Sequence, residues 1–340
     1  MDNHNTVLEI KNLKIYYNIS EGCVKAVDNV SLQLCRGDVL GLVGESGCGK
    51  TTLIKSLLKI LPSNGYINGG TANYKGEDIF KMDNSRIQKL RWNEISIISQ
   101  SAMNALDPIY RVGDQIVEAI TEHEKVKKEK AYKRAEKLFD LVGVDRKRLK
   151  DYPHQYSGGM KQRAVIAMAL ALNPDIILAD EPTTALDVVV QAQILQRINK
   201  LLENYHGSMI MATHDISVIA QTCNKVAVMY GGKILEFGDK RRIVTNPYHP
   251  YTLGLKNAFP SITGEKKSLI SIPGNPPDLL VPPHGCIFAP RCPFVKEICK
   301  NKSPLPEKVE EGYVSCHRLE EVDKLRYYAE QEKTWLGNSI

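Results

Sequence analysis

The stretch GESGCGKT, from Gly44 to Thr51, constrains this chain more than any other part of its sequence. It fits the phosphate-loop pattern G-x-x-x-x-G-K-[ST] and lies between two regular elements. The apolar run in DVLGLVGE predicts a buried strand before it, and KTTLIKSLLKIL predicts a helix after it, which we expect Pro62 to end. Strand, glycine-rich loop and helix in this order predict an α/β domain that binds phosphate groups.

The loop chemistry predicts what individual residues do. The glycines let backbone N–H groups turn toward phosphate oxygens, Lys50 adds a charge for the β- and γ-phosphates, and the Thr51 hydroxyl is expected to ligate Mg²⁺. Cys48 is expected to be a small filler, with a reactive thiol as the alternative. The predicted nucleotide-binding residues of the loop are Gly44, Glu45, Ser46, Gly47, Cys48, Gly49, Lys50, Thr51 and Thr52.

Short apolar runs alternate with helical patterns through roughly the first 240 residues, which predicts a mostly parallel sheet covered by helices on both faces. Further strands are expected at ISIIS, DIILAD and SMIMATHD, and a hairpin is expected in KVAVMYGGKILEFG. Helices are expected in KKEKAYKRAEKLFDLVGV, ended by Gly143, and in GMKQRAVIAMALAL, ended by Asn173 and Pro174. The stretch HRLEEVDKLRYYAEQEKTWLG is expected to form a last helix.

Two acidic residues and a histidine follow the later strands. Asp180, at the end of DIILAD, is expected to hold Mg²⁺ directly or through water, and Glu181 to orient or deprotonate an attacking water. His214 follows another strand, where it is expected to fix that water and sense the nucleotide, although a structural histidine is the alternative.

Composition predicts a soluble, cytoplasmic protein. No run approaches the roughly 20 apolar residues that span a bilayer, and the polar start MDNHNTVLEIKN is unlike a signal peptide. The net charge is +6, and acidic residues interrupt the basic runs EKVKKEKAYKRAEK and DRKRLK. These runs are expected to be solvated helix faces, with a surface for nucleic acid or anionic lipid as the alternative.

The stretch YSGGMKQR, from Tyr156 to Arg163, resembles the signature motif of ABC-type ATPases. The glutamine in ISQSAMNALDP, the acidic pair, the ALD triplet and the histidine follow that family's order, and the resemblance covers roughly residues 6 to 260. It implies a P-loop NTPase (RecA-like) core of the α/β class, with a helical subdomain at about 101–165 and an antiparallel β part. The signature departs from the commonest form, with Tyr156 in place of leucine and Met160 in place of glutamine.

The resemblance also implies roles for particular residues. Tyr17 matches the aromatic residue that stacks on adenine, with Tyr16 as a rival. The implied catalytic residues are Glu181, His214 and Gln100, and the implied Mg²⁺ ligands are Thr51, Gln100 and Asp180. Residues Ser157, Gly158, Gly159 and Met160 are implied to meet ATP held by a second ATPase subunit, and Asp187 belongs to the ALD loop. Ser157 is also expected to cap the helix that follows it.

The form YSGGM, the stretch HPYT at 249–252 and the tail together resemble the peptide branch of ABC importers, with nickel importers as close relatives. This likeness implies an ATP-hydrolysing motor on the cytoplasmic face of the membrane. Its implied partners are a related or identical ATPase subunit, two permease subunits and, indirectly, an extracytoplasmic binding protein. The segment after Gln100 is implied to contact the permease. The alternatives are a soluble ABC ATPase of translation or DNA repair and a subunit that does not hydrolyse ATP.

We place a domain boundary near Asn246, between a nucleotide-binding domain at 1–245 and an extension at 246–340. The extension begins with NPYHPYTLGLKNAFPS, and the later stretch SIPGNPPDLLVPPHGC is rich in proline and expected to be extended. The cysteines that come next have the spacing C-x5-C-x6-C-x16-C. The resemblance implies a [4Fe–4S] cluster in this small irregular domain, and zinc or unmetallated thiols are the alternatives. Arg291, Lys296 and Lys300 are expected to offset the charge of a cluster. The four cysteines are Cys286, Cys292, Cys299 and Cys316.

Overall fold

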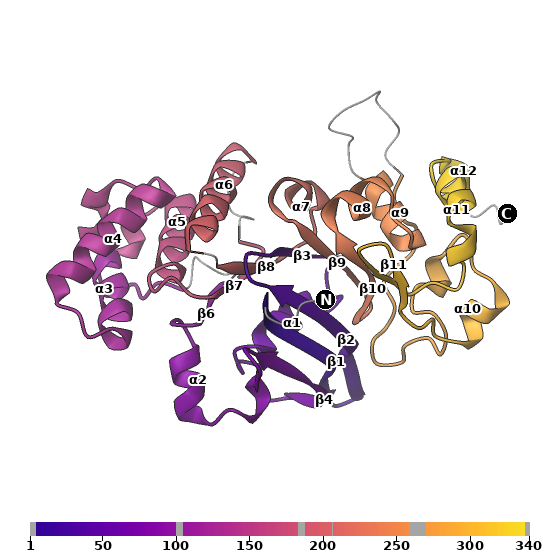
Figure 1. Ribbon diagram of the computed structural model, residues 1–340, viewed down its shortest axis with the longest axis horizontal. Helices are drawn as coiled ribbons and strands as arrows, with labels where there is room; N and C mark the ends of the chain where they lie inside the picture. The colour runs from indigo at the N-terminus through magenta and orange to yellow at the C-terminus, as the bar shows by residue number, and fades with distance from the viewer. Residues whose placement is uncertain (1–4, 100–104, 183–187, 206, 259–269, 337–340) are drawn as a thin grey trace. The chain divides into compact units, whose positions relative to one another are not determined.

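The structure is a computed structural model that describes residues 5–99, 105–182, 188–205, 207–258 and 270–336. The chain divides into two compact units. Unit 1 comprises residues 1–8, 34–39 and 74–212, and unit 2 comprises residues 9–33, 40–73 and 213–340. Figure 1 labels most of the helices and strands of both.

Unit 2 contains a sheet built from strands β1 (Thr6–Ile19), β2 (Gly22–Cys35) and β4 (Gly65–Tyr74), in the order β2-β1-β4. Buried side chains alternate along its strands, with Leu13 and Ile15 on β1 and Val30 and Leu32 on β2. A spacing of two places such residues on one face of a strand. This sheet therefore presents one apolar face to the core.

A second sheet region of unit 2 carries the phosphate loop. Strand β3 (Val39–Val43) runs parallel to β9 (Lys225–Tyr230), and β10 (Lys233–Asp239) returns antiparallel to β9. The turn between β9 and β10 is Gly231-Gly232, so the predicted hairpin is confirmed. The tail adds two strands that the sequence did not predict: β12 (Gly312–Val314) pairs with β10, and β11 (Glu307–Val309) pairs with β12.

Helix α1 (Lys50–Ser56) is shorter than predicted, because it ends before Pro62 is reached. Lys59 adopts a left-handed conformation with φ of 51°, and the Ile60 N–H donates to the Lys55 C=O at 3.1 Å. A left-handed residue with this backbone bond is a common way for helices to end. The prediction that Pro62 ends the helix was therefore wrong.

The remaining helices of unit 2 lie in the part of the chain after β8 (Ser208–Thr213). They are α7 (Ile216–Thr222), α8 (Lys240–Thr245), α9 (Pro250–Asn257), α10 (Glu297–Asn301), α11 (Val322–Ala329) and α12 (Glu332–Trp335), together with the short 3₁₀ turns η6 (Ala289–Arg291) and η7 (Leu319–Glu321). The single last helix predicted from sequence was wrong. Gln331 is extended there, and the Trp335 indole N–H bonds to the Ala329 C=O at 2.9 Å, which ends α11.

Unit 1 contains the parallel strands β6 (Ile95–Ile98), β7 (Ile176–Asp180) and β8 (Ser208–Thr213), in the order β6-β7-β8. All three were predicted as strands, and their parallel pairing confirms the predicted sheet type. Long helix α6 (Val188–Tyr205) lies between β7 and β8 in the chain. Ahead of β6, unit 1 also holds β5 (Glu77–Asp78), η2 (Ile79–Lys81) and α2 (Asn84–Leu90).

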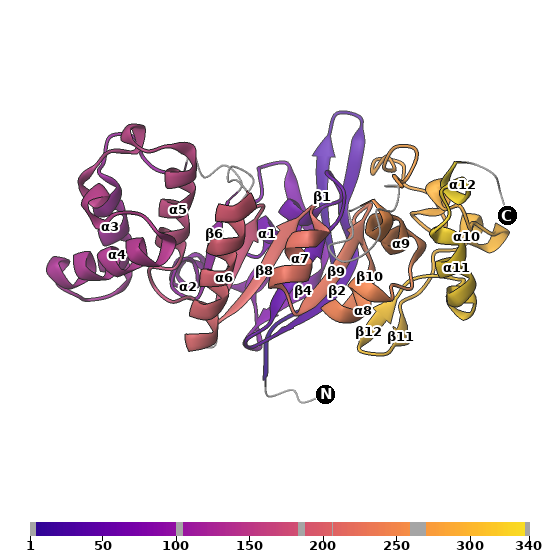
Figure 2. The ribbon, with the colours of Figure 1, turned by 90° about the horizontal axis from the view of Figure 1, so that it is seen from above.

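The helical part of unit 1 consists of α3 (Val112–His123), α4 (Lys128–Val142) and α5 (Gly158–Ala169), with η4 (Arg146–Lys150) and η5 (Pro153–Gln155) between the last two. Figures 1 and 2 show α3, α4 and α5 as one group. Helix α4 ends at Gly143 with φ of 70°, as predicted, and its buried residues include Ala131, Ala135, Leu138 and Val142. Among the described residues, no helix is both long enough and apolar enough to cross a membrane.

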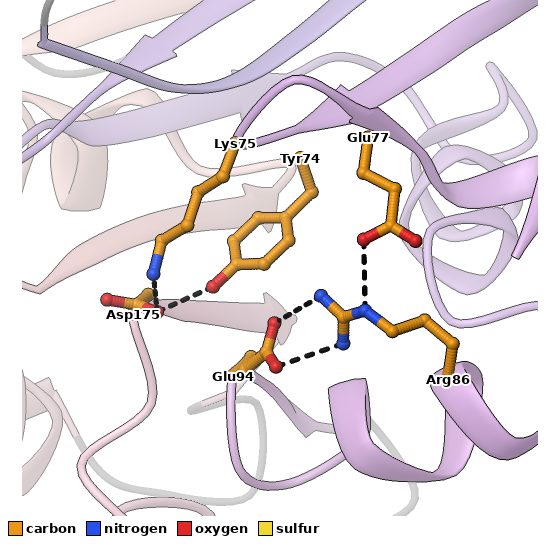
Figure 3. Close-up of polar contacts among 6 residues, drawn as sticks. All are labelled: Tyr74, Lys75, Glu77, Arg86, Glu94 and Asp175. Carbon is orange, nitrogen blue, oxygen red and sulfur yellow. Dashed lines mark hydrogen bonds and ion pairs between the residues drawn. The ribbon is translucent and has the colours of Figure 1, made fainter.

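A polar network in unit 1 fixes the start of β7 (Figure 3). Asp175 accepts hydrogen bonds from the Tyr74 hydroxyl at 2.5 Å and the Lys75 ammonium at 2.7 Å. Burial and the bond to Asp175 raise the pKa of Tyr74, so its phenol stays a donor. Arg86 makes two 2.9 Å bonds to Glu94 in the same region. The strand that ends in Asp180 is therefore anchored where it begins.

Candidate functional site

The phosphate loop of unit 2 leaves β3 at Val43 and opens directly into α1, as predicted. At Gly44 an added Cβ would lie 2.0 Å from the Met229 C=O, and at Gly49 it would lie 2.2 Å from the Ala26 C=O. Gly49 also has φ of 106°. These close approaches require glycine at both positions. No described side chain caps α1, which leaves its positive N-terminus facing the loop.

Lys50 lies buried in this loop, with 5% of its surface exposed. Its ammonium donates to the Gly44 C=O at 2.6 Å and the Glu45 C=O at 2.8 Å. A buried ammonium needs such partners, because desolvation without them is costly. The lysine is therefore held at the centre of the loop.

Cys48 is also buried in the loop, and burial raises the pKa of its thiol even though Lys50 lies nearby. A thiol that keeps its proton is a poor nucleophile. These surroundings of Cys48 favour the predicted role of a small filler over that of a reactive thiol.

Tyr17 and Tyr16 point to different partners within unit 2. The Tyr17 hydroxyl lies 3.1 Å from the Thr52 hydroxyl at the start of α1, whereas the Tyr16 hydroxyl donates to Asp28 at 3.0 Å. Tyr17 is thus the tyrosine of the pair that contacts the phosphate-loop helix.

The acidic pair of unit 1 ends β7. Asp180 is 3% exposed and lies opposite Ala212 of β8, and the Glu181 N–H donates to the Ala212 C=O at 2.9 Å. Glu181 adopts φ of 47°, in the left-handed region that non-glycine residues rarely visit. Such local strain is often found at functional positions.

The signature residues of unit 1 open helix α5. The Ser157 hydroxyl accepts a hydrogen bond from the Met160 N–H at 3.3 Å, which confirms the predicted cap. Tyr156 is buried, and its hydroxyl donates to the Arg148 C=O at 2.6 Å. The tyrosine thus fills an apolar position and satisfies its own hydroxyl. Gln162 donates to the Pro182 C=O, which ties α5 to the segment after Glu181.

The structure distributes the predicted site residues over both units. Unit 2 holds Tyr17, the phosphate loop and the four tail cysteines, together with His214, which is exposed between β8 and α7. Unit 1 holds the acidic pair and the signature residues. Gln100 and Asp187 lie outside the described residues.

The four tail cysteines are neighbours in unit 2, and none forms a disulfide. Burial raises the pKa values of Cys286, Cys292 and Cys316, to about 12 for Cys316, and electrostatic repulsion from other thiols of the set adds to the shift. Thiols that repel one another in this way lie close together. Yet across the described ranges, no group of three or more His, Cys, Asp or Glu residues forms a site for a metal ion.

The basic residues near the cysteines are paired with carboxylates, and their predicted effect on the charge of a cluster stays a prediction. Lys296 bonds to Glu321, and Lys300 lies 3.3 Å from Glu297. Arg291 reaches the phosphate loop, where it donates to the Glu45 carboxylate at 2.8 Å.

Two residues at the phosphate loop were missed from the sequence. One is Arg291, and the other is Tyr251, whose hydroxyl accepts the Glu45 N–H at 3.1 Å. The HPYT stretch that contains Tyr251 was a visible signal, although nothing in it indicated which loop it would contact.

Comparisons with known proteins agree with the motif order. The family described as "ABC transporter" matches residues 27–184, and the family described as "Oligopeptide/dipeptide transporter, C-terminal region" matches residues 235–299. The second match begins in β10 and includes Cys286, Cys292 and Cys299.

Several curated relatives match almost the whole chain. The oligopeptide transport ATP-binding protein OppD of Escherichia coli is 44% identical over 88% of this chain and 90% of its own length. The dipeptide transport ATP-binding protein DppD of Lactococcus lactis is 46% identical over 88% of this chain and 86% of its own length. DppD of Caldanaerobacter subterraneus is 40% identical over 93% of this chain and 98% of its own length.

A solved structure is similar over the larger part of the chain. It is a dimeric, post-hydrolysis form of the ATP-binding cassette MJ0796 bound to ADP and Pi. It has a TM-score of 0.64 and 27% identity, and the match covers 69% of this chain and 99% of that one. The ABC ATPase fold with mixed α/β content is thereby confirmed.

Proposed function

This chain belongs to the ATP-binding subunits of ABC transporters, and from that membership we propose that it is the ATP-hydrolysing motor of a membrane importer for dipeptides or oligopeptides. The observation that carries the proposal is the 44–46% identity to OppD and DppD over 88% of this chain, together with the peptide-transporter family match that reaches into the tail as far as residue 299. Those relatives are named for peptide transport, which favours a peptide cargo over nickel. The same identity disfavours a soluble ABC ATPase of translation or repair.

The loop geometry supports a role for Lys50 in binding ATP. Its ammonium is held by two loop carbonyls, and phosphate oxygens are stronger partners for it because they carry charge. In the proposed site the β- and γ-phosphates take over these bonds, and Tyr17 stacks on the adenine. Thr51, Asp180 and Gln100 would hold Mg²⁺, which neutralises charge on the phosphates.

Hydrolysis is assigned to three residues. Glu181 orients and deprotonates the attacking water, and His214 and Gln100 hold that water against the γ-phosphate. The left-handed backbone of Glu181 and its bond to β8 support this role, because they fix where its side chain starts. The intact set of Lys50, Glu181 and His214 disfavours a subunit that does not hydrolyse ATP.

The signature residues are assigned to the ATP of a second subunit. Ser157 is exposed, and it opens a helix whose first N–H groups can meet a γ-phosphate. Gly158, Gly159 and Met160 complete this surface, and we assign Asp187 to the same dimer interface from the family resemblance alone. The dimeric form of the similar cassette supports pairing with an identical or related chain.

Membrane association is assigned to permease subunits, which place the chain on the cytoplasmic face of the membrane. The segment that follows Gln100 exposes two large side chains, with Ile109 70% exposed and Tyr110 55% exposed. Neighbouring exposed apolar residues often mark a protein contact. This pair supports the proposal that two permease subunits, and through them a binding protein, are partners.

We assign a metal cluster to the tail. Four cysteine thiolates are the ligand set that a [4Fe–4S] cluster takes, and the proposal depends on this ligand type because the described residues contain no group already arranged as a metal site. Cys286, Cys292, Cys299 and Cys316 would hold it, and coordination would help to fold a proline-rich segment. We retain 246–340 as an extension of the nucleotide-binding domain at 1–245, built onto its sheet through β12.

The motor role is tested by replacing Glu181 with glutamine. The variant should bind ATP, form a stable dimer on gel filtration with ATP, and turn over at less than about 1% of the wild-type rate, since general-base catalysis contributes typically 10²–10⁴-fold. Lys50→Ala is the matched control and should lose ATP binding itself. Unchanged turnover in Glu181→Gln would exclude Glu181 as the residue that orients and deprotonates the attacking water. Transport is tested by asking whether peptides stimulate ATPase activity with the co-purified permease.

The cluster is tested by anaerobic purification and metal analysis. Brown protein with about four irons per chain, and colourless protein after Cys299→Ser, are the expected results. Colourless wild-type protein that contains only zinc would overturn the assignment.

A further inference from the structure

Glu45, the second residue of the phosphate loop, is held through all of its polar groups. Its C=O accepts from Lys50 within the loop. Its N–H and its carboxylate instead bond to residues 206 and 246 positions further along the chain, in the tail of the same unit. Tyr251 accepts the N–H at 3.1 Å, and Arg291 donates to the carboxylate at 2.8 Å.

Arg291 is itself fixed in place. Its Nε donates to the Pro273 C=O at 2.9 Å and its Nη2 to the Ile272 C=O at 3.1 Å. Its Nη1 reaches both Glu45 and the Tyr230 hydroxyl. The Arg291 side chain is 7% exposed and that of Glu45 is 26% exposed, so solvent screens this ion pair only in part. Because the guanidinium is used on several sides, lysine would not replace it.

Tyr251 is fixed from the other side of the contact. It belongs to α9, where His249 caps the helix by accepting the Tyr251 N–H at 3.0 Å. Its ring is fully buried and packs against Tyr230 at 4.6 Å and Phe288 at 5.3 Å, measured between ring centroids. A rigid aromatic ring on a capped helix leaves the hydroxyl little freedom to move.

We propose that Arg291 and Tyr251 are positioning residues of the nucleotide site, which hold Glu45 so that the phosphate loop keeps the shape that receives ATP. This inference rests on the proposed function. Both side chains bond directly to Glu45, so they act on the loop through it. The tail is therefore part of the ATP site as well as a carrier of cysteines.

The physical reason is preorganisation. A loop that must order itself when ATP binds loses affinity, because its entropy is removed at that moment. Removing one charge-assisted bond at Glu45 should therefore weaken ATP binding about tenfold, the effect of one such hydrogen bond. Turnover at saturating ATP should change by less than about twofold, because the catalytic groups remain.

The test is a double-mutant cycle on the full chain, with ATP affinity measured by calorimetry and KM and kcat measured in steady state. Arg291→Met and Glu45→Gln should each raise the Kd and KM for ATP about tenfold, and the double variant should be no worse than either single one. Tyr251→Phe should raise Kd by a smaller factor, since it removes one neutral hydrogen bond.

Matched controls separate positioning from general damage to the tail. Arg318→Met alters an arginine next to Cys316 that bonds to the Phe294 C=O, and Tyr313→Phe removes a half-buried hydroxyl that donates to the Ser31 C=O. Both should leave the Kd for ATP unchanged. If Arg318→Met weakens binding as much as Arg291→Met, or if the effects at Arg291 and Glu45 add, the proposal is wrong.

The outcome also separates this inference from the proposed function. Wild-type protein that binds ATP, together with Lys50→Ala protein that does not, supports the ATPase assignment whatever Arg291→Met does. An unchanged Kd in Arg291→Met then overturns the positioning role alone. Should Arg291→Met fail to fold, Glu45→Gln tests the same contact from its more exposed partner.

Discussion

Replacing Glu236 with glutamine should strongly destabilise unit 2. Glu236 is fully buried on β10 and accepts three hydrogen bonds. Arg242 donates to its Oε1 at 2.6 Å, the Tyr248 N–H to the same oxygen at 2.9 Å, and the His249 N–H to Oε2 at 3.0 Å. This carboxylate therefore sets the entry into α9, the helix that carries Tyr251.

The size of the effect follows from burial. The Arg242 side chain is only 8% exposed, so glutamine would leave a buried guanidinium without its counter-charge. It would also turn an N–H donor toward the His249 N–H. Breaking one partner of a buried ion pair costs about 3–5 kcal/mol. At a urea m-value of about 2–3 kcal/mol/M, the unfolding midpoint should fall by about 1–2.5 M.

Urea unfolding followed by Trp335 fluorescence measures this effect. Trp335 is buried, and a side chain added at Gly254 of α9 would meet it, so the indole reports on this helix. A Trp92→Phe background removes the second tryptophan of the chain. The control is Asp323→Asn, which breaks an arginine–carboxylate pair whose acid is 91% exposed. Equal midpoints for Glu236→Gln and Asp323→Asn would refute the reasoning.

Three further predictions concern α9, the permease surface and the adenine site. Between pH 7 and pH 5, the free energy of unfolding measured in urea should fall by about 2 kcal/mol more in the wild type than in His249→Asn. Burial lowers the pKa of His249 in the folded protein from 6.5 to about 3. Below pH 6.5 only the unfolded chain takes up the proton, so stability decreases as the pH falls. Equal losses of stability in the wild type and in His249→Asn would contradict this. Ile109→Asp with Tyr110→Ser should abolish permease co-purification and keep ATP binding, whereas retained co-purification would exclude this surface. Tyr17→Ala should raise the Kd for ATP about tenfold, as loss of a stacking contact does, and Tyr16→Ala should not; the reverse result would exchange their roles.

Features that depend on neighbouring residues could be predicted from sequence. The phosphate loop was predicted because its glycines, lysine and flanking elements lie within a short stretch of chain. The cap at Ser157 and the end of α4 at Gly143 were predictable for the same reason, since capping involves residues within one helical turn. Local chemistry therefore accounts for the correct part of the fold.

Features that depend on distant residues could not be predicted in this way. The pairing of β12 with β10 joins Gly312 to Gly238, and no local pattern marks three-residue strands. Helix α1 ends at a left-handed lysine, although lysine carries no strong signal for that conformation. Arg291 was interpreted from its neighbours in sequence as a counter-charge for the cysteines, whereas its partner Glu45 is 246 positions away.

The contacts of Arg291 bear on how the tail and the ATPase depend on each other. Arg291 immediately precedes Cys292, one of the four clustered thiols, and its guanidinium is bonded to the phosphate loop. Residues that are adjacent in the chain cannot move independently by more than the freedom of one peptide unit. On the proposed positioning role, a change that displaces the backbone at Cys292 therefore also displaces the Arg291–Glu45 contact. A chain cut before α9 would keep its predicted phosphate loop, acidic pair and signature residues, yet it would lack both side chains that hold Glu45.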